Sequence, residues 1–143
     1  MPENEIVAKK IAFIKEQVNE IESLIQSKSR KEILSDPWLI KGLKYSLQVA
    51  IEAMIDIIYY ICAKHFKKAP VDARDGLGIL LENNLIAEKD FLTFSQMIGF
   101  RNKVVHGYQE ISSEKVYEIA ANELSDFDRF IGLILEYIIK KEC

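Results

Sequence analysis

The sequence of 143 residues is poor in the residues that build cross-links and metal sites, with two cysteines and two histidines. Cys62 lies in an apolar stretch and is interpreted as a core residue, whereas Cys143 ends the chain. There is no Cys-x-x-Cys motif and no His/Cys cluster, which argues against a disulfide framework and against a zinc site. We therefore expect neither a metal nor another cofactor.

The chain also lacks an excess of positive charge, since its net charge is −3 and its pI is about 5.5. A protein that coats nucleic acid by bulk electrostatics needs a basic domain, so that class is excluded, although a local basic cleft is not. The N-terminal residues 2–5, Pro-Glu-Asn-Glu, do not resemble the basic and then apolar start of a signal peptide. We expect a cytoplasmic protein.

No strand pattern, linker, repeat or low-complexity segment is present. A content of 49% hydrophobic and 29% charged residues is typical of a globular protein, and the length suits one domain over residues 1–143. Apolar residues recur at helical spacing, so we predict an all-α fold, an antiparallel bundle of four long helices and a short one. The expected ranges are residues 4–27, 37–66, 72–81, about 87–106 and 113–141, with a basic connector at 28–31.

The helix over 37–66 is predicted to be the most buried one. It is apolar between Leu47 and Cys62 apart from a narrow stripe of Gln48, Glu52 and Asp56. Two acids inside this run argue against a transmembrane span. A helix with so thin a polar stripe needs cover on several sides, by the bundle and plausibly by a partner subunit. The stripe has two interpretations: an acid that orients Arg101 or His106, or a solvated or salt-bridged face.

Polar chemistry is concentrated in one stretch, which runs Arg101-Asn102-Lys103-Val-Val-His106-Gly107-Tyr108. Gly107 is placed to end the preceding helix, because glycine adopts a positive φ without a Cβ clash. Arg101 and His106 are five residues apart, about 140° around an ideal helix. Either the last turn loosens or each residue meets a partner from elsewhere.

The negative end of the helix dipole repels phosphate at this position, so Arg101 and Lys103 would have to supply the attraction. A simpler interpretation also exists, because arginine and histidine near a helix end commonly act as C-terminal caps. Spacing alone does not separate a reactive site from such a cap.

The pattern Arg101-Asn102-x-x-x-His106-x-Tyr108, near the end of the penultimate helix of a small all-α chain, resembles the HEPN superfamily. The His-x-Tyr ending is similar to its HepT-like toxin branch, and the resemblance covers essentially the whole chain. It implies a metal-independent endoribonuclease of a type VII-like toxin–antitoxin pair, with Arg101 and His106 as catalytic residues, supported by Asn102 and Lys103, in a site built at a homodimer interface.

The resemblance further implies a nucleotidyltransferase antitoxin as partner, which silences the toxin by AMPylation of Tyr108. The expected substrate is RNA, and no membrane is involved. Two alternatives stay open from the sequence. One is a non-catalytic HEPN binding module that holds a nucleotide or a nucleotidyltransferase partner. The other is a dimerisation bundle in which the motif only caps a helix.

Overall fold

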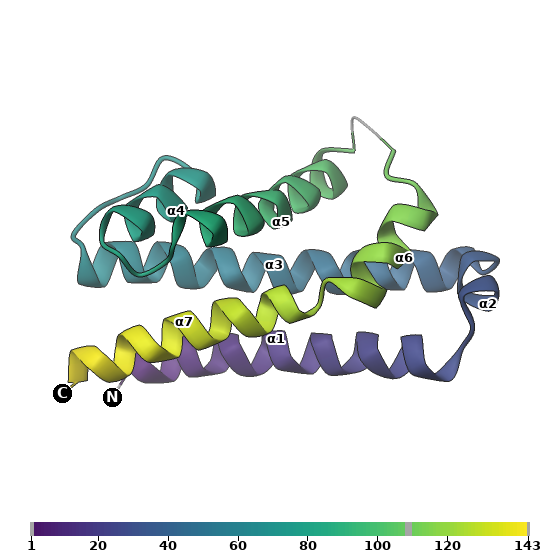
Figure 1. Ribbon diagram of the computed structural model, residues 1–143, viewed down its shortest axis with the longest axis horizontal. Helices are drawn as coiled ribbons and strands as arrows, with labels where there is room; N and C mark the ends of the chain where they lie inside the picture. The colour runs from purple at the N-terminus through teal and green to yellow at the C-terminus, as the bar shows by residue number, and fades with distance from the viewer. Residues whose placement is uncertain (1, 108–109, 143) are drawn as a thin grey trace.

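A computed structural model describes residues 2–107 and 110–142, and these residues fold into helices joined by short connections (Figure 1). No strand occurs within these two ranges, so the predicted all-α class is confirmed. In chain order the helices are α1 (Pro2–Ser27), α2 (Arg30–Leu34), α3 (Pro37–His65), α4 (Ala73–Glu82), α5 (Glu88–His106), α6 (Ser113–Asn122) and α7 (Ser125–Glu142).

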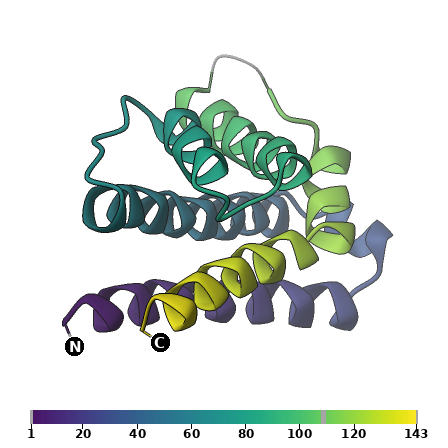
Figure 2. The same cartoon turned by 60° about the vertical axis from the view of Figure 1, so that its left-hand side comes forward.

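The helices form three layers with α3 in the middle (Figure 1). On one side of α3 lies a layer of α1 and α7, and on the other lies a layer of α4 and α5. The view turned by 60° shows the same separation, with both chain termini at one end of the bundle (Figure 2). Helices α2 and α6 close the other end and pack against α3. The helix that carries the motif, α5, therefore rests directly on the central helix.

The long helices begin where local capping fixes them. At the start of α3 the Asp36 carboxylate accepts hydrogen bonds from the backbone N–H groups of Trp38 (3.0 Å) and Leu39 (3.4 Å), and Pro37 occupies the first turn. Side-chain oxygens satisfy the N–H groups that have no intrahelical partner there. The predicted start of the central helix is confirmed.

The predicted basic connector at residues 28–31 is wrong in part, because it leads into the short helix α2. The Ser29 hydroxyl accepts a hydrogen bond from the Glu32 backbone N–H at 3.1 Å, and the Glu32 carboxylate accepts one from the Ser29 N–H at 2.9 Å. This reciprocal pair is a capping box, whose Ser-x-x-Glu signature is present in the sequence. Arg30 then lies over the Tyr117 ring of α6 at 5.5 Å from its centroid, so α2 is tied to α6.

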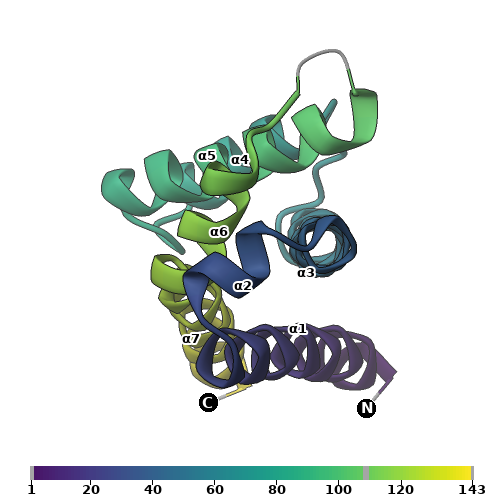
Figure 3. The ribbon, with the colours of Figure 1, turned by 90° about the vertical axis from the view of Figure 1, so that its right-hand side faces the viewer.

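The single last helix predicted over 113–141 is also wrong. It is divided into α6 and α7 at Glu123 and Leu124, where the N–H groups of Asp126 and Phe127 turn back to the carbonyls of those two residues. The 4-3 apolar spacing continues through the break, because both halves bury the same kind of face, so periodicity could not reveal it. The division lets α6 cross over α3 while α7 runs along α1 (Figure 3).

The core is centred on α3, which has buried apolar side chains from Ile40 to Cys62. This helix is long and apolar enough to cross a bilayer, but 56% of its most apolar window is buried inside the bundle. A helix that packs on α1, α4, α5 and α6 at once is the core helix of the fold.

Candidate active site

Arg101 is held against the central helix by Glu52. Its Nε donates to Glu52 Oε2 at 3.1 Å and its Nη2 donates to the same oxygen at 3.0 Å. The side chains are 28% and 34% exposed, so the ion pair sits at the edge of the bundle and not in its core. Charge-assisted bonds of this kind are stronger than neutral ones, although solvent weakens them at such exposure.

Two amides complete the environment of this ion pair. The Gln48 Nε2 donates to Glu52 Oε2 at 3.2 Å, one helical turn before Glu52 on α3. The Asn102 carbonyl oxygen accepts from Arg101 Nη1 at 3.1 Å. A guanidinium has five N–H groups. Three are used in these contacts with described residues, which leaves two for an anion such as phosphate.

The third polar residue of the stripe, Asp56, lies one turn beyond Glu52 but has a different partner. Its carboxylate accepts a hydrogen bond from Lys10 of α1 at 2.8 Å, and both side chains are about half exposed. The two acids of the stripe therefore contact different helices, Glu52 contacting α5 and Asp56 contacting α1. Only Glu52 has a contact that brings it to the motif.

His106 is the last residue of α5, and its side chain is exposed. Gly107 follows with φ 65°, and its N–H donates to the Lys103 carbonyl at 3.0 Å, which confirms the predicted glycine end of the helix. Because α5 stays helical through His106, the last turn does not loosen. Arg101 and His106 thus leave the helix in directions about 140° apart.

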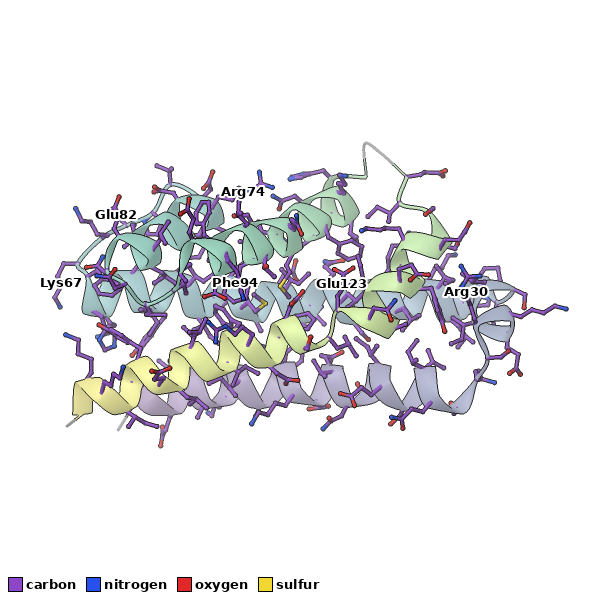
Figure 4. All side chains as sticks on the ribbon, viewed as in Figure 1. Arg30, Lys67, Arg74, Glu82, Phe94 and Glu123 are labelled. Carbon is purple, nitrogen blue, oxygen red and sulfur yellow. The ribbon has the colours of Figure 1, made fainter. Side chains whose placement is uncertain are left out.

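Gly99 proves to be a point of close approach within the same helix. A Cβ placed there would lie 3.0 Å from Nη2 of Arg74, a side chain of α4 that reaches across α5 and donates to the Ser95 carbonyl at 3.4 Å. Figure 4 shows Arg74 above α5. The spacing of the motif does not place Arg74 near α5, whereas a glycine inside a helix can mark the close approach of a neighbour.

Lys103 is exposed and lines a pocket of about 730 Å³ between α5 and α6. Tyr108 lies outside the described residues, so its predicted role is not addressed by the geometry. Within residues 2–107 and 110–142, no group of three His, Cys, Asp or Glu side chains is placed to hold a metal ion.

The chain is thus an all-α bundle in which Glu52 of the central helix holds Arg101 of α5, and His106 ends α5. The model of the Ribonuclease HepT-like family matches residues 14–134. The chain belongs to this family, which confirms the expected class, an endoribonuclease.

Individual relatives agree with this assignment. The chain is 33% identical over 131 residues to the mRNA nuclease HepT of Shewanella oneidensis. The aligned residues cover 92% of this chain and 97% of the relative. It is 26% identical over 109 residues to a putative RNase of Archaeoglobus fulgidus, covering 69% of this chain and 82% of that protein.

Solved structures give the same result. A tri-AMPylated HEPN toxin of Shewanella oneidensis, in complex with an MNT antitoxin, matches with a TM-score of 0.83 and 32% identity over 92% of this chain and 97% of that one. The cytosolic protein YutE of Bacillus subtilis matches with a TM-score of 0.81 at 17% identity, which concerns the fold alone. The family is established by the family model and by the relative that is 33% identical.

Proposed function

We propose that this chain is a metal-independent endoribonuclease toxin that cleaves RNA with Arg101 and His106 at a homodimer interface. The observation that carries this proposal is the anchored guanidinium. Glu52 and Asn102 hold Arg101 by three hydrogen bonds, and two N–H groups remain for a phosphate. A capping arginine would need no such anchor on another helix.

The proposed chemistry uses the substrate's own hydroxyl group. One histidine takes the proton from the RNA 2′-hydroxyl, whose oxygen attacks the adjacent phosphorus. The bond to the 5′-oxygen breaks, a protonated histidine gives that oxygen its proton, and a cyclic phosphate remains. Arg101 stabilises the charge that develops on the phosphate oxygens. In this scheme Glu52 is a positioning residue, and Lys103 adds electrostatic attraction.

Two histidines are needed for this scheme, and each chain provides one at the motif, His106. A second copy fits the uncovered side of α3, which no other helix covers in the end-on view (Figure 3). Trp38, Tyr45 and Tyr59 are 77%, 63% and 36% exposed there, at seven-residue intervals that include Glu52. Exposed aromatic side chains in a row are typical of an interface. We propose that this face forms the homodimer and brings two motifs together.

Tyr108 is the proposed site of regulation. The related Shewanella toxin is tri-AMPylated and bound to an MNT antitoxin. By analogy, a nucleotidyltransferase antitoxin would transfer AMP from ATP to the Tyr108 hydroxyl and release pyrophosphate. The added phosphates would compete with RNA for the cations of the motif. A toxin of this kind acts on cellular RNA, and we propose that it is cytoplasmic.

Cleavage of RNA by the purified, unmodified chain in EDTA tests the enzymatic proposal. We expect the wild type to produce fragments with cyclic phosphate ends, and His106→Ala and Arg101→Ala to produce none. Thermal melts serve as the control, because both variants should remain folded. A folded wild type that cleaves no RNA at any concentration would favour the non-catalytic binding module instead.

Mixed dimers test whether the site needs two histidines. Wild type and His106→Ala are refolded together in equal amounts so that subunits pair at random. If both histidines of a dimer are required, only about one quarter of the dimers are active, compared with about one half of the activity if each chain works alone. Activity in direct proportion to the wild-type fraction would exclude the shared site.

A further inference from the structure

The pocket between α5 and α6 is a cavity that the proposed mechanism does not use. It has a volume of about 730 Å³, which is within the usual range of about 300–1,000 Å³ for small-molecule sites. Met97, Phe100 and Lys103 of α5 form one wall, and Ser112, Lys115 and Ile119 at the start of α6 form the other. Both helices pack on α3, whose Ile51 lies at the floor.

The pocket is next to the motif but separate from the Arg101 anchor. Lys103 points about 200° around α5 from Arg101, so the pocket lies on the other side of the helix. His106 is one turn beyond Lys103 and only about 60° away from its direction. A ligand bound against Lys103 would therefore lie beside His106, with one end near the proposed reaction.

The lining has two chemical halves. Lys103 at the motif and Lys115 at the start of α6 are cations, Arg74 beside Ser95 and Gly99 is a third, and the apolar part of the lining includes Phe100. Glu123 and Asp126 lie where α6 meets α7, and Figure 4 labels Glu123 at this junction. Eight residues separate Glu123 from Lys115, which corresponds to about 12 Å along a helix. Glu110 is a further acid of the lining. Burial raises the pKa of Asp126.

A nucleotide has the matching distribution of groups. Its phosphate suits lysine and arginine, its base stacks on aromatic and apolar side chains, and its ribose hydroxyl and base amino groups donate to acids. We propose that the pocket binds one nucleoside monophosphate unit, with the base against Phe100 and the phosphate at Lys103 and Lys115.

Two sources could provide this unit, and both rest on the proposed function. One is the nucleotide of the RNA substrate next to the scissile phosphate. The other is an adenylate attached to Tyr108, since Ser112 is four residues further on and four residues span at most about 14 Å. The binding itself requires neither cleavage nor the antitoxin.

Calorimetric titration of the unmodified full chain with AMP tests the proposal. We expect AMP to bind, and Lys115→Glu to weaken the binding by about tenfold or more, because a charge-assisted contact becomes a repulsion. Lys9→Glu, an equal charge change at an exposed site on α1, should bind like the wild type. Absence of AMP binding at millimolar concentration, or equal affinity in Lys115→Glu, would overturn the proposal.

Two further arms separate the sources. If the attached adenylate is the occupant, the chain modified by its antitoxin no longer binds free AMP. If an RNA nucleotide is the occupant, the modified chain still binds AMP, and Lys115→Glu raises the KM for RNA about tenfold while kcat changes little. Retained AMP binding together with wild-type cleavage by Lys115→Glu contradicts both sources and overturns the assignment. A chain that binds AMP but cleaves no RNA would refute the proposed function and leave the pocket assigned.

Discussion

Replacing Glu52 by glutamine tests whether the central helix positions Arg101. The amide keeps the size of the side chain and an oxygen that accepts hydrogen bonds, but it removes the charge that binds Nε and Nη2 of Arg101 at 3.1 and 3.0 Å. We therefore expect the fold to persist and the guanidinium to be held less firmly.

The expected effect on stability is small. A hydrogen bond to a charged group contributes about 1.5–3 kcal/mol when buried and a neutral one about 0.5–1.5 kcal/mol, so the difference is about 1 kcal/mol. Arg101 and Glu52 are 28% and 34% exposed, and solvent screening reduces this figure to about 0.5–1 kcal/mol. The effect on catalysis is larger, a loss of about tenfold or more in kcat/KM, because a small displacement of a catalytic group is costly.

Urea unfolding of a double-mutant cycle measures the first quantity. The set consists of the wild type, Glu52→Gln, Arg101→Lys and the double variant, all at one protein concentration, because the stability of the proposed dimer depends on it. We expect a coupling energy of about 0.5–1 kcal/mol. Gln48→Ala is the matched control, because Gln48 donates to the same oxygen at 3.2 Å without touching Arg101.

Two results would refute the reasoning. A coupling energy of zero would show that the Arg101–Glu52 contact contributes nothing in solution. Unchanged RNA cleavage by Glu52→Gln would show that Arg101 needs no anchor on α3, and the main support for the reactive site over the capping arginine would be lost.

Three further variants test how the bundle holds α5 and its neighbours. Arg129→Ala should cost about 1–2 kcal/mol at pH 7, because it removes two bonds from the buried Asp90 carboxylate, and the cost should be smaller in acid, where that carboxylate is protonated. The sign follows from the pKa of Asp90, which hydrogen bonding by Arg129 lowers in the folded state. The stabilisation is therefore present above the pKa of Asp90 in the unfolded chain, and it is lost as the pH falls through the pKa of Asp90 in the folded chain. Urea unfolding at both pH values measures it. Gly76→Ala should lower stability by about 1–3 kcal/mol, because its Cβ would lie 2.6 Å from Cγ2 of Ile58, and an unchanged thermal melt would contradict this. Lys67→Gly should raise stability by about 1 kcal/mol, since Lys67 has φ 54° after the end of α3, and a lower midpoint in urea would argue against backbone strain there.

Much of the fold could be predicted because the helices bury regular apolar stripes and start at recognisable caps. The start of α3 follows from Asp36 and the end of α5 follows from Gly107, because both residues act on the backbone next to them. The break between α6 and α7 could not be predicted, because no proline or glycine marks it and the apolar spacing continues across it. Its cause is tertiary, since α6 packs on α2 and α3 whereas α7 packs on α5, and both pack on α1.

The sequence indicates candidate residues for the site but does not indicate their contacts. The motif indicates Arg101 and His106, and the polar stripe on α3 indicates both Glu52 and Asp56 as partners. One helical turn separates these two acids, which spacing alone cannot rank, and only the packing of α5 on α3 selects Glu52. The pocket that Arg74 and Lys115 line is formed by segments far apart in the sequence. Hydrophobic periodicity predicts single helices but not which helices pack together.

The stripe on α3 therefore makes a comparison of two similar acids possible. Asp56 binds Lys10 with side chains 54% and 43% exposed, a surface ion pair that contributes at most about 1 kcal/mol. Asp56→Asn removes one negative charge from the same face as Glu52→Gln, so general electrostatic effects of the two changes should be alike. We expect Asp56→Asn to retain RNA cleavage within about twofold, because it leaves the Arg101 anchor intact. Equal loss of cleavage in both variants would mean that the acidity of the stripe matters and not the anchoring of Arg101, and Glu52 would lose its role as a positioning residue.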